Sequence, residues 1–328
     1  MSILVTGGAG YIGSHCVAAL LAQGEDVVVI DDLSKGHKGS LKGGRLYTGD
    51  VGDREFLRKV FQKESIAAVI HFAAFSLVGE SVQLPEKYFR NNVTAGISLI
   101  ETMLEFNVPH MVFSSTAAIY GEPENTPILE TDRQQPTNPY GESKLMVEKM
   151  LRWCDDAHGL KYCALRYFNV AGALADGSIG EDHRPETHLI PLVLETAAGK
   201  RASLSLFGTD YPTRDGTCVR DYIHVEDLID AHILALRYLR SGKPSAAFNL
   251  GNGQGFSNRE IIDAAARVTG REIPVIEAAR RPGDPATLIA SSKKAMEVLG
   301  WKPKYTKVED IIATAWKWHS QSAEGYKD

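Results

Sequence analysis

The chain of 328 residues is poor in cysteine, in basic clusters and in long apolar runs, and each shortage excludes a class of protein. Its four cysteines are scattered without C-x-x-C spacing, so we expect reduced, packed thiols and no metal site. A net charge of -5 without a long basic cluster argues against a nucleic-acid surface. Only residues 1–24 stay uncharged for long enough to imitate a signal peptide or membrane span, yet they lack a basic start and glycines interrupt them. We therefore expect a cytoplasmic protein that binds neither nucleic acid nor membrane.

Glycine, by contrast, is concentrated in one turn near the start, Thr6-Gly-Gly-Ala-Gly-Tyr-Ile-Gly13. A short apolar strand at 3–5 precedes this turn, and residues 12–23 favour a helix. A strand, turn and helix of this kind bind the pyrophosphate of a dinucleotide, because the glycines permit a tight bend and the helix N-terminus favours negative charge. A G-x-x-G-x-x-G turn alone is weak evidence, so the surrounding pattern carries the inference.

A second apolar strand, 26–30, ends in Asp31 and Asp32. Asp31 lies where a carboxylate can accept hydrogen bonds from the ribose hydroxyls of the cofactor and repel a 2′-phosphate, which favours NAD over NADP. Two alternatives stay open: Asp31 could be an ordinary turn residue, and Lys35 and Lys38 could attract a phosphate.

Apolar and helical segments alternate through the first half of the chain, which predicts parallel βαβ units. We expect strands at 67–72, 110–114 and 162–169 and helices around 55–64, at 88–106 and from Asn138-Pro139 onward. After residue 171 the chain is richer in Gly, Pro and Asp, although 225–239 favours a helix and 247–250 a strand that could return to the first sheet. The predicted fold is α/β: a Rossmann-type doubly wound parallel sheet in residues 1–170, with a return of about 222–250, and a smaller α/β domain in 171–328.

Tyr140 is the only one of twelve tyrosines with a lysine four residues on, at Lys144. On a helix these positions share a face, so the ammonium can lie near the phenol and favour the phenolate. A phenol with a pKa near ~10 is otherwise a poor base at neutral pH. Thr116 follows the strand 110–114 at the expected ligand-binding edge of the sheet, where a hydroxyl can relay a proton. Alone, Tyr140 could be a half-buried helix residue and Lys144 a solvated charge; together, after a nucleotide-binding half, they indicate hydride transfer.

Several further motifs occur along nearly the whole chain. They are His71-Phe-Ala-Ala74, Val78-Gly-Glu-Ser81, Arg166-Tyr-Phe-Asn169, Gly208-Thr-Asp-Tyr-Pro212, Val219-Arg-Asp-Tyr-Ile-His-Val225 and Arg280-Arg-Pro-Gly-Asp284. With the glycine turn and the Tyr140–Lys144 pair, they make the chain resemble the extended short-chain dehydrogenase/reductase family, and within it the epimerases of UDP-hexoses.

The resemblance implies an isomerase that interconverts UDP-galactose and UDP-glucose by NAD-dependent transient oxidation at C4 through a 4-keto intermediate. It also implies a homodimer formed through helices of the NAD domain, and a UDP-sugar-binding role for 171–328. The catalytic residues would be Tyr140, Lys144 and Thr116. NAD would contact these three residues and also Gly7, Gly10, Tyr11, Ile12, Gly13, Asp31, Asp32, Leu33, Ser34, Lys35, Gly36, Asp50, Val51, Phe72, Ala73, Ala74, Phe75, Ser76, Asn91 and Phe168. The UDP-sugar would contact Thr116, Tyr140, Asn169, His188, Leu189, Ser205, Leu206, Phe207, Arg220, Arg281, Asp284 and Leu288.

The chain departs from the family pattern at three of these positions. Thr116 replaces the usual serine and keeps the hydroxyl, while Ser76 replaces a lysine often found near the pyrophosphate. His188 replaces an asparagine; it can still donate a hydrogen bond, but it can also titrate. Leu288 stands at a gate beside the sugar 2-substituent that is often tyrosine in relatives confined to plain hexoses, so we also expect some activity on UDP-GalNAc and UDP-GlcNAc.

Three other functions were weighed against this interpretation. A nucleotide-sugar 4,6-dehydratase or decarboxylase of the same fold needs an extra acid beside the active threonine, whereas Thr116 is followed by Ala117 and Ala118. A non-catalytic NAD-sensing protein would have no use for Tyr140 and Lys144. A hydrolase is disfavoured because the sequence contains no G-x-S-x-G nucleophile elbow.

Overall fold

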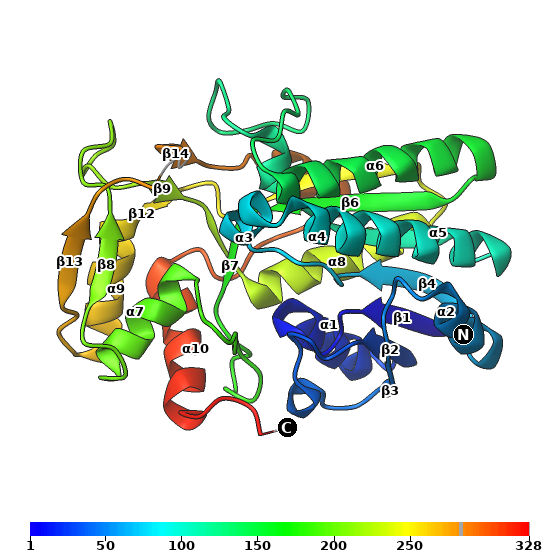
Figure 1. The fold of residues 1–328 in the computed structure, drawn as a ribbon, viewed down its shortest axis with the longest axis horizontal. Coiled ribbons are helices and arrows are strands. Elements are labelled where there is room, and N and C mark those ends of the chain that lie inside the picture. Colours follow the sequence, from blue (N-terminus) through cyan, green and yellow to red (C-terminus); the bar gives the residue numbers. More distant parts are fainter. Residues whose placement is uncertain (282–284, 328) are drawn as a thin grey trace.

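A seven-stranded parallel sheet forms the centre of the computed structural model, which describes residues 1–281 and 285–327 (Figure 1). The strand order is β11-β6-β5-β4-β1-β2-β3, so the direction of winding reverses between β1 and β4. The strands are β1 (Ser2–Thr6), β2 (Val27–Asp31), β3 (Arg45–Thr48), β4 (Ile66–His71), β5 (His110–Thr116), β6 (Lys161–Tyr167) and β11 (Ala246–Leu250).

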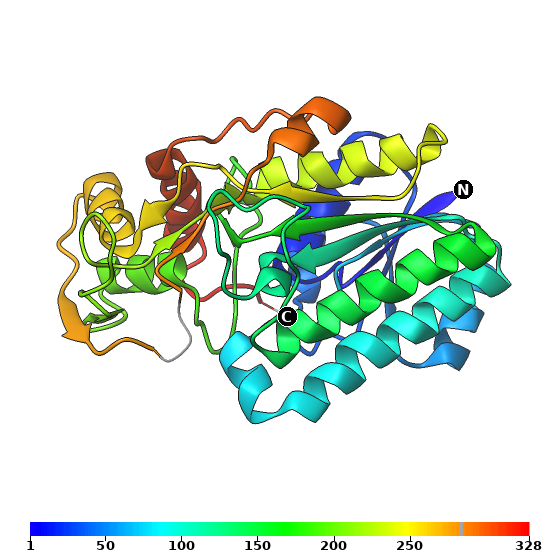
Figure 2. The same ribbon diagram turned by 90° about the horizontal axis from the view of Figure 1, so that it is seen from above.

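Helices cover both faces of this sheet (Figure 2), because its strands are apolar on both sides. Ile3 and Val5 pack into one core and Leu4, between them, into the other, as alternate residues of a strand must. On the first face lie α1 (Tyr11–Ala22) and α8 (Val225–Arg240). The second face carries α2 (Arg54–Lys63), α5 (Ala95–Glu105) and α6 (Pro139–His158).

Three smaller sheets lie beside the large one: the first is next to it, and the other two are at one end of the molecule (Figure 1). The first pairs β7 (Asn169–Ala171) with β10 (Tyr222–His224), and the second pairs β8 (Leu204–Phe207) with β13 (Val275–Ala278). A three-stranded sheet joins β12 (Phe256–Ser257), β9 (Val219–Arg220) and β14 (Thr287–Leu288). Helices α7 (Leu189–Ala197), α9 (Asn258–Thr269) and α10 (Val308–Gln321) pack around a separate apolar core there.

The predicted α/β fold with a doubly wound sheet is confirmed, with local differences. Strand β3 was not predicted, because it is a four-residue edge strand whose residues are at most half-buried. The expected helix 88–106 is divided into α4 (Pro85–Tyr88), a π-helical turn (Phe89–Thr94) and α5, after a short α3 (Val78–Gln83). The expected strand 162–169 ends at Tyr167, because Asn169 pairs with β10 instead.

Residues 246–250 form the outermost strand of the large sheet, beside β6. The division of the chain into an NAD domain and a UDP-sugar domain stays a prediction. Among the described residues, no helix is both long and apolar enough to cross a membrane.

Candidate active site

The site lies where the carboxyl ends of β1 and β4 diverge, which is the point at which open α/β sheets bind ligands. There the Thr6 hydroxyl lies 2.6 Å from His71 Nδ1, and the backbone amides of Phe72 and Ala73 both donate to Thr6 O (3.0 and 3.2 Å). Burial, together with the charge of Lys144, lowers the pKa of His71 to about 3. The imidazole is therefore neutral, and it joins the two strands at the edge of the site.

The glycine turn provides a close-packed cradle at the start of α1. A Cβ at Gly13 would lie 2.0 Å from Gly7 O, so only glycine allows this bend. Gly10 precedes the helix, and the first turn of α1 carries no acidic residue. Gly7, Gly10, Tyr11, Ile12 and Gly13 thus surround a helix N-terminus that is suited to a phosphate.

Asp31 is almost fully buried at the end of β2, where it accepts hydrogen bonds from Ala9 N (2.9 Å) and Leu33 N (2.8 Å). Burial raises its pKa above the ordinary value, and these backbone bonds act in the opposite direction. A carboxylate has about four acceptor positions. Asp31 can therefore fix the glycine turn to the loop after β2 and still accept from a ribose, although that second role stays a prediction.

Two of the other expected NAD residues, Asp32 and Asp50, accept local hydrogen bonds from the loops that carry them. Asp32 accepts from Ser34 N (2.9 Å), and Asp50 accepts from Gly52 N (2.7 Å). The next residue, Val51, is buried in the core.

Asn92 was not found from the sequence, yet it holds the segment 72–76. Its Oδ1 accepts from Phe75 N (2.9 Å), and its Nδ2 donates to Phe75 O (3.0 Å) and to Ser143 Oγ (2.9 Å). This buried amide ties the expected NAD loop to α6. The neighbouring Asn91, which was expected to contact NAD, donates to Asn92 Oδ1 (3.0 Å).

Tyr140 and Thr116 meet because α6 begins tightly against the end of β5. The side chain of Asn138 caps α6 by accepting from Gly141 N (2.9 Å). A Cβ at Gly141 would lie 2.6 Å from Ala118 O, so glycine is needed for this approach. Tyr140, in the first turn, lies close enough to the Thr116 side chain for this hydroxyl to lower the pKa of the phenol.

Lys144 lies one turn further along α6 and is nearly fully buried. Its Nζ donates to Ser114 O (2.8 Å) and lies 5.0 Å from the centre of the Phe113 ring. Burial lowers the pKa of Lys144 to about 7, although Glu148 raises it. Burial also raises the pKa of Tyr140, whereas the Thr116 hydroxyl lowers it. The three expected catalytic residues therefore surround the last residues of β5, with the ammonium anchored to that strand.

A buried ion pair supports this arrangement, and sequence reasoning missed it. Arg166 donates to Glu148 through Nη2 (2.6 Å) and Nε (3.0 Å). Ser115 also donates to Glu148, and Arg166 Nη1 donates to the Tyr120 hydroxyl (2.8 Å). Glu148, one turn after Lys144, is thus bonded to β6 through Arg166 and to β5 through Ser115, which fixes α6 to both strands.

On the opposite side, the strand pairing places Leu288 beside Arg220. Leu288 and Phe168 pack against one small apolar cluster, which contains Ile119 and Tyr120. Asn169 is half-buried in β7. These residues converge on one region between β6 and the three-stranded sheet.

The remaining expected substrate residues are more dispersed. The guanidinium of Arg281 lies 3.9 Å from the centre of the Phe207 ring. Ser205 is exposed, but the side chain of Leu206 is buried in the third core, so only its backbone can face a ligand. Leu189 begins α7, and His188 precedes it. Asp284 lies outside the described residues.

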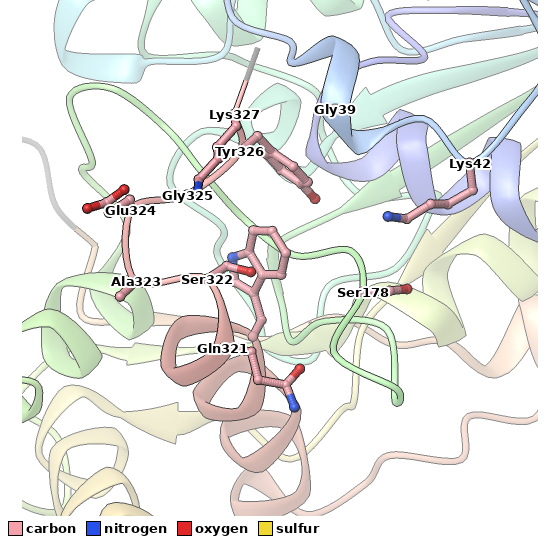
Figure 3. Close-up of a pocket in the computed structure, with 11 residues that line it drawn as sticks. Gly39, Lys42, Ser178, Gln321, Ser322, Ala323, Glu324, Gly325, Tyr326 and Lys327 are labelled. Atoms are coloured by element: carbon pink, nitrogen blue, oxygen red, sulfur yellow. The ribbon is translucent and has the colours of Figure 1, made fainter.

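A pocket of about 500 Å³ lies elsewhere, between Gly39, Lys42 and the C-terminal tail (Figure 3). The ring of Tyr326 lies 5.4 Å from that of His37 and 4.6 Å from that of Trp318. None of the expected site residues lines this pocket, so it is separate from the catalytic edge.

A sequence profile of the NAD dependent epimerase/dehydratase family matches residues 3–251. The chain belongs to this family. UDP-glucose 4-epimerase of Lacticaseibacillus casei is 59% identical over 329 residues, covering 100% of this chain and 99% of that protein. A crystal structure of UDP-glucose 4-epimerase superposes with a TM-score of 0.98 at 55% identity, with 100% of both chains covered.

Two further solved structures bear on the ligands of the family. UDP-glucose 4-epimerase from Brucella ovis in complex with NAD has a TM-score of 0.94 and 48% identity, covering 96% of this chain and 97% of that chain. The UDP-Glc/GlcNAc 4-epimerase from Campylobacter jejuni has a TM-score of 0.86 and 44% identity, covering 98% and 99%. The family and its NAD-bound member confirm NAD as the cofactor.

Proposed function

We propose that this chain interconverts UDP-glucose and UDP-galactose by transient oxidation at C4 of the hexose. The observation that carries the proposal is the convergence of Tyr140, Thr116 and Lys144 at the end of β5, beside the glycine turn. The similarity of the whole chain to UDP-glucose 4-epimerases supports the same activity. The protein is accordingly an isomerase.

Bound NAD supplies the acceptor, and then the donor, of the C4 hydride. The cradle fits such a group. A Cβ at Gly13 would lie 2.0 Å from Gly7 O, so glycine is needed for the tight turn that lets a pyrophosphate reach the helix N-terminus. Tyr140 takes the proton of the sugar 4-OH, and the nearby Thr116 hydroxyl relays or orients that proton. Lys144, fixed by Ser114 O, stabilises the phenolate electrostatically.

Epimerisation further requires that the 4-keto sugar present its other face before hydride returns. Recognition must therefore rest on UDP, with the hexose held loosely. We place the UDP-sugar among residues 171–328, with Arg220 and Arg281 toward the diphosphate, because a guanidinium matches phosphate oxygens. Residues 1–170 and about 222–250 hold NAD in this proposal.

The rival 4,6-dehydratase is disfavoured by the surroundings of Thr116. It is followed by Ala117 and Ala118, and Glu148 is already bonded to Arg166 and Ser115. A free acid for elimination is therefore not provided by these residues.

We further propose a cytoplasmic homodimer formed through α5 and α6. Ile97 on α5 and Met146 and Trp153 on α6 are exposed, and Met146 and Trp153 are seven residues apart on one helix face. Sedimentation of the wild type and of Trp153→Glu tests this, and a wild type that sediments as a monomer would reject it.

The decisive test of the function uses purified protein and UDP-galactose alone. We expect UDP-glucose to accumulate until both sugars are at equilibrium, without net formation of NADH. Formation of a 4-keto-6-deoxy sugar would favour the dehydratase. No conversion by a folded, NAD-containing protein would contradict both functions.

A further inference from the structure

Four side chains that could ligate a metal converge in the segment between β7 and α7. They are Glu181, His183, Glu186 and His188, and the ligand atoms of all four lie within 4.8 Å of one another. Among the residues that the structure describes, this is the one group of three or more such side chains. The four residues span eight positions of the chain, so the backbone already holds them close together.

The ligand atoms are close enough to reach one tetrahedral ion after small side-chain movements. His188 Nδ1 lies 2.5 Å and His183 Nδ1 3.1 Å from Glu181 Oε1. The same two nitrogens lie 3.7 and 3.8 Å from the oxygens of Glu186. Zinc bonds of about 2.0–2.2 Å to nitrogen and oxygen separate tetrahedral ligands by roughly 3.3–3.5 Å. An ion would therefore replace the hydrogen bond between His188 and Glu181 and draw the Glu186 oxygens slightly closer.

A cation would be favoured by the two carboxylates of this cluster. The side chains of Glu181 and Glu186 are only 5% and 7% exposed, and two carboxylates cannot be buried side by side without compensation. A dication bound to two neutral imidazoles would compensate both carboxylates.

The backbone of this segment is also held by two other parts of the chain. Trp318 Nε1 donates to Glu181 O (3.1 Å), and Tyr326 N donates to Asp182 Oδ2 (2.9 Å). His37 Nε2 lies 3.0 Å from Asp182 O. Loop 37–40 and the C-terminal tail (Figure 3) thus fix the backbone that carries the ligands.

We propose that Glu181, His183, Glu186 and His188 bind one divalent transition-metal ion of the zinc class. The ion would fix the loop at the start of α7, beside the Tyr11 ring, whose centre is 6.4 Å from that of His183. Because Nδ1 of His188 faces the carboxylates and its side chain is 48% exposed, Nε2 remains for the UDP-sugar. That last role rests on the proposed function, whereas metal binding does not.

Metal binding is tested on the full-length protein with its NAD, after treatment with a chelator and removal of the chelator. Zn²⁺ is added alone and the bound metal is measured by mass spectrometry; Co²⁺ is added separately, because tetrahedral Co²⁺ gives intense visible absorption bands. We expect about one ion per chain, a Co²⁺ spectrum of tetrahedral type and a rise in Tm with added Zn²⁺.

His183→Ala and Glu186→Gln should weaken binding at least about tenfold, as removal of a ligand must. The matched controls are His158→Ala and Glu297→Gln, which change an exposed residue of the same type elsewhere and should bind like the wild type. Glu181→Gln, which keeps the side-chain shape, serves if the other variants do not fold. Retained NAD absorbance confirms folding in each case.

The proposal is overturned if the wild type binds no Zn²⁺ under these conditions. The four side chains would then interact only through hydrogen bonds and ion pairs. It is equally overturned if folded His183→Ala and Glu186→Gln variants bind as much metal as the controls. Since the readout does not use turnover, failure here leaves the epimerase proposal untouched, and the reverse also holds.

Discussion

The two sides of the active site hold their residues by different means. On the sheet side, Thr116 ends a buried strand of seven residues, and Tyr140 lies in the first turn of a 20-residue helix. On the opposite side, Arg220 and Leu288 lie on strands of only two residues each. Short strands and loops open locally at a lower free energy than a central sheet. The rigid side thus suits acid–base chemistry, and the other side suits a substrate whose hexose must turn over.

The largest effect should come from the rigid side. Tyr140→Phe removes only the hydroxyl that accepts the sugar proton, so we expect the turnover rate to fall by about 10²–10⁴. NAD content and Tm should stay near those of the wild type. Steady-state kinetics with UDP-galactose, alongside the absorbance of bound NAD, measure both. Turnover within a few-fold of wild type would remove Tyr140 from the mechanism.

Lys144→Met should be comparably damaging, because it removes the positive charge that favours the phenolate. Activity should recover in part as the pH rises toward the pKa of the Tyr140 phenol, which burial places above its ordinary value. A pH–rate profile of the variant tests this, and a flat profile would mean that Lys144 acts mainly by contact.

The same variant should be more stable than the wild type near neutral pH. Burial lowers the pKa of Lys144 to about 7, although Glu148 acts against it. The unfolded chain therefore binds more protons than the folded chain at neutral pH, and wild-type stability rises with pH from there. Lys144→Met removes this cost, so its gain in Tm should be larger near pH 7 than near pH ~10. A gain that grows with pH would contradict the assignment.

On the flexible side, Leu288→Tyr tests whether the gate sets substrate breadth. We expect the wild type to act on UDP-galactose and UDP-glucose and, more slowly, on the two N-acetylated sugars. A phenol at this position would overlap an acetamido group at a cost of ~1–3 kcal/mol, so kcat/KM for the acetylated pair should fall about 10–200-fold. The rates with the plain hexoses serve as the internal control. A wild type inactive on UDP-GlcNAc would end the gate argument and leave the epimerase function intact.

The smallest effect is expected at Asp31. Asp31→Asn removes the repulsion of a 2′-phosphate, so the ratio of the Kd values for NADP and NAD should fall about tenfold, or about 1.4 kcal/mol. Because Asp31 also accepts from Ala9 N and Leu33 N, some loss of stability should accompany the change. An unchanged cofactor preference would leave Asp31 with the structural role alone.

The same contrast explains what the sequence could predict. The glycine turn and the Tyr140–Lys144 pair are local patterns, and the strands they adjoin are long and apolar. The two-residue strands β9 and β14 carry no periodicity, so the meeting of Arg220 with Leu288 depends on pairing between residues 68 positions apart.

Residues whose hydrogen-bond partners are distant in sequence could not be identified from the sequence either. No sequence pattern marks Asn92, because its partners Phe75 and Ser143 reach it only in the folded chain. The spacing of Glu181, His183, Glu186 and His188 was visible in the sequence, but the expectation of no metal site rested on cysteine spacing. Only the fold shows that all four side chains turn to one point.

The hydroxyl of Tyr11 donates to Gly172 O (2.7 Å), which joins the glycine turn to the loop that leaves β7. A Cβ at Gly172 would lie 2.5 Å from the His224 ring, so this loop has little freedom to move aside. We expect the release of NAD from the proposed site to break this part-buried hydrogen bond as well as the contacts of the cofactor itself. Since the proposed reaction returns NAD to its starting state in every cycle, slow cofactor exchange carries no penalty in rate. We therefore expect the residence time of NAD to exceed the turnover time by many cycles, and the cofactor to behave as a permanent part of the folded protein.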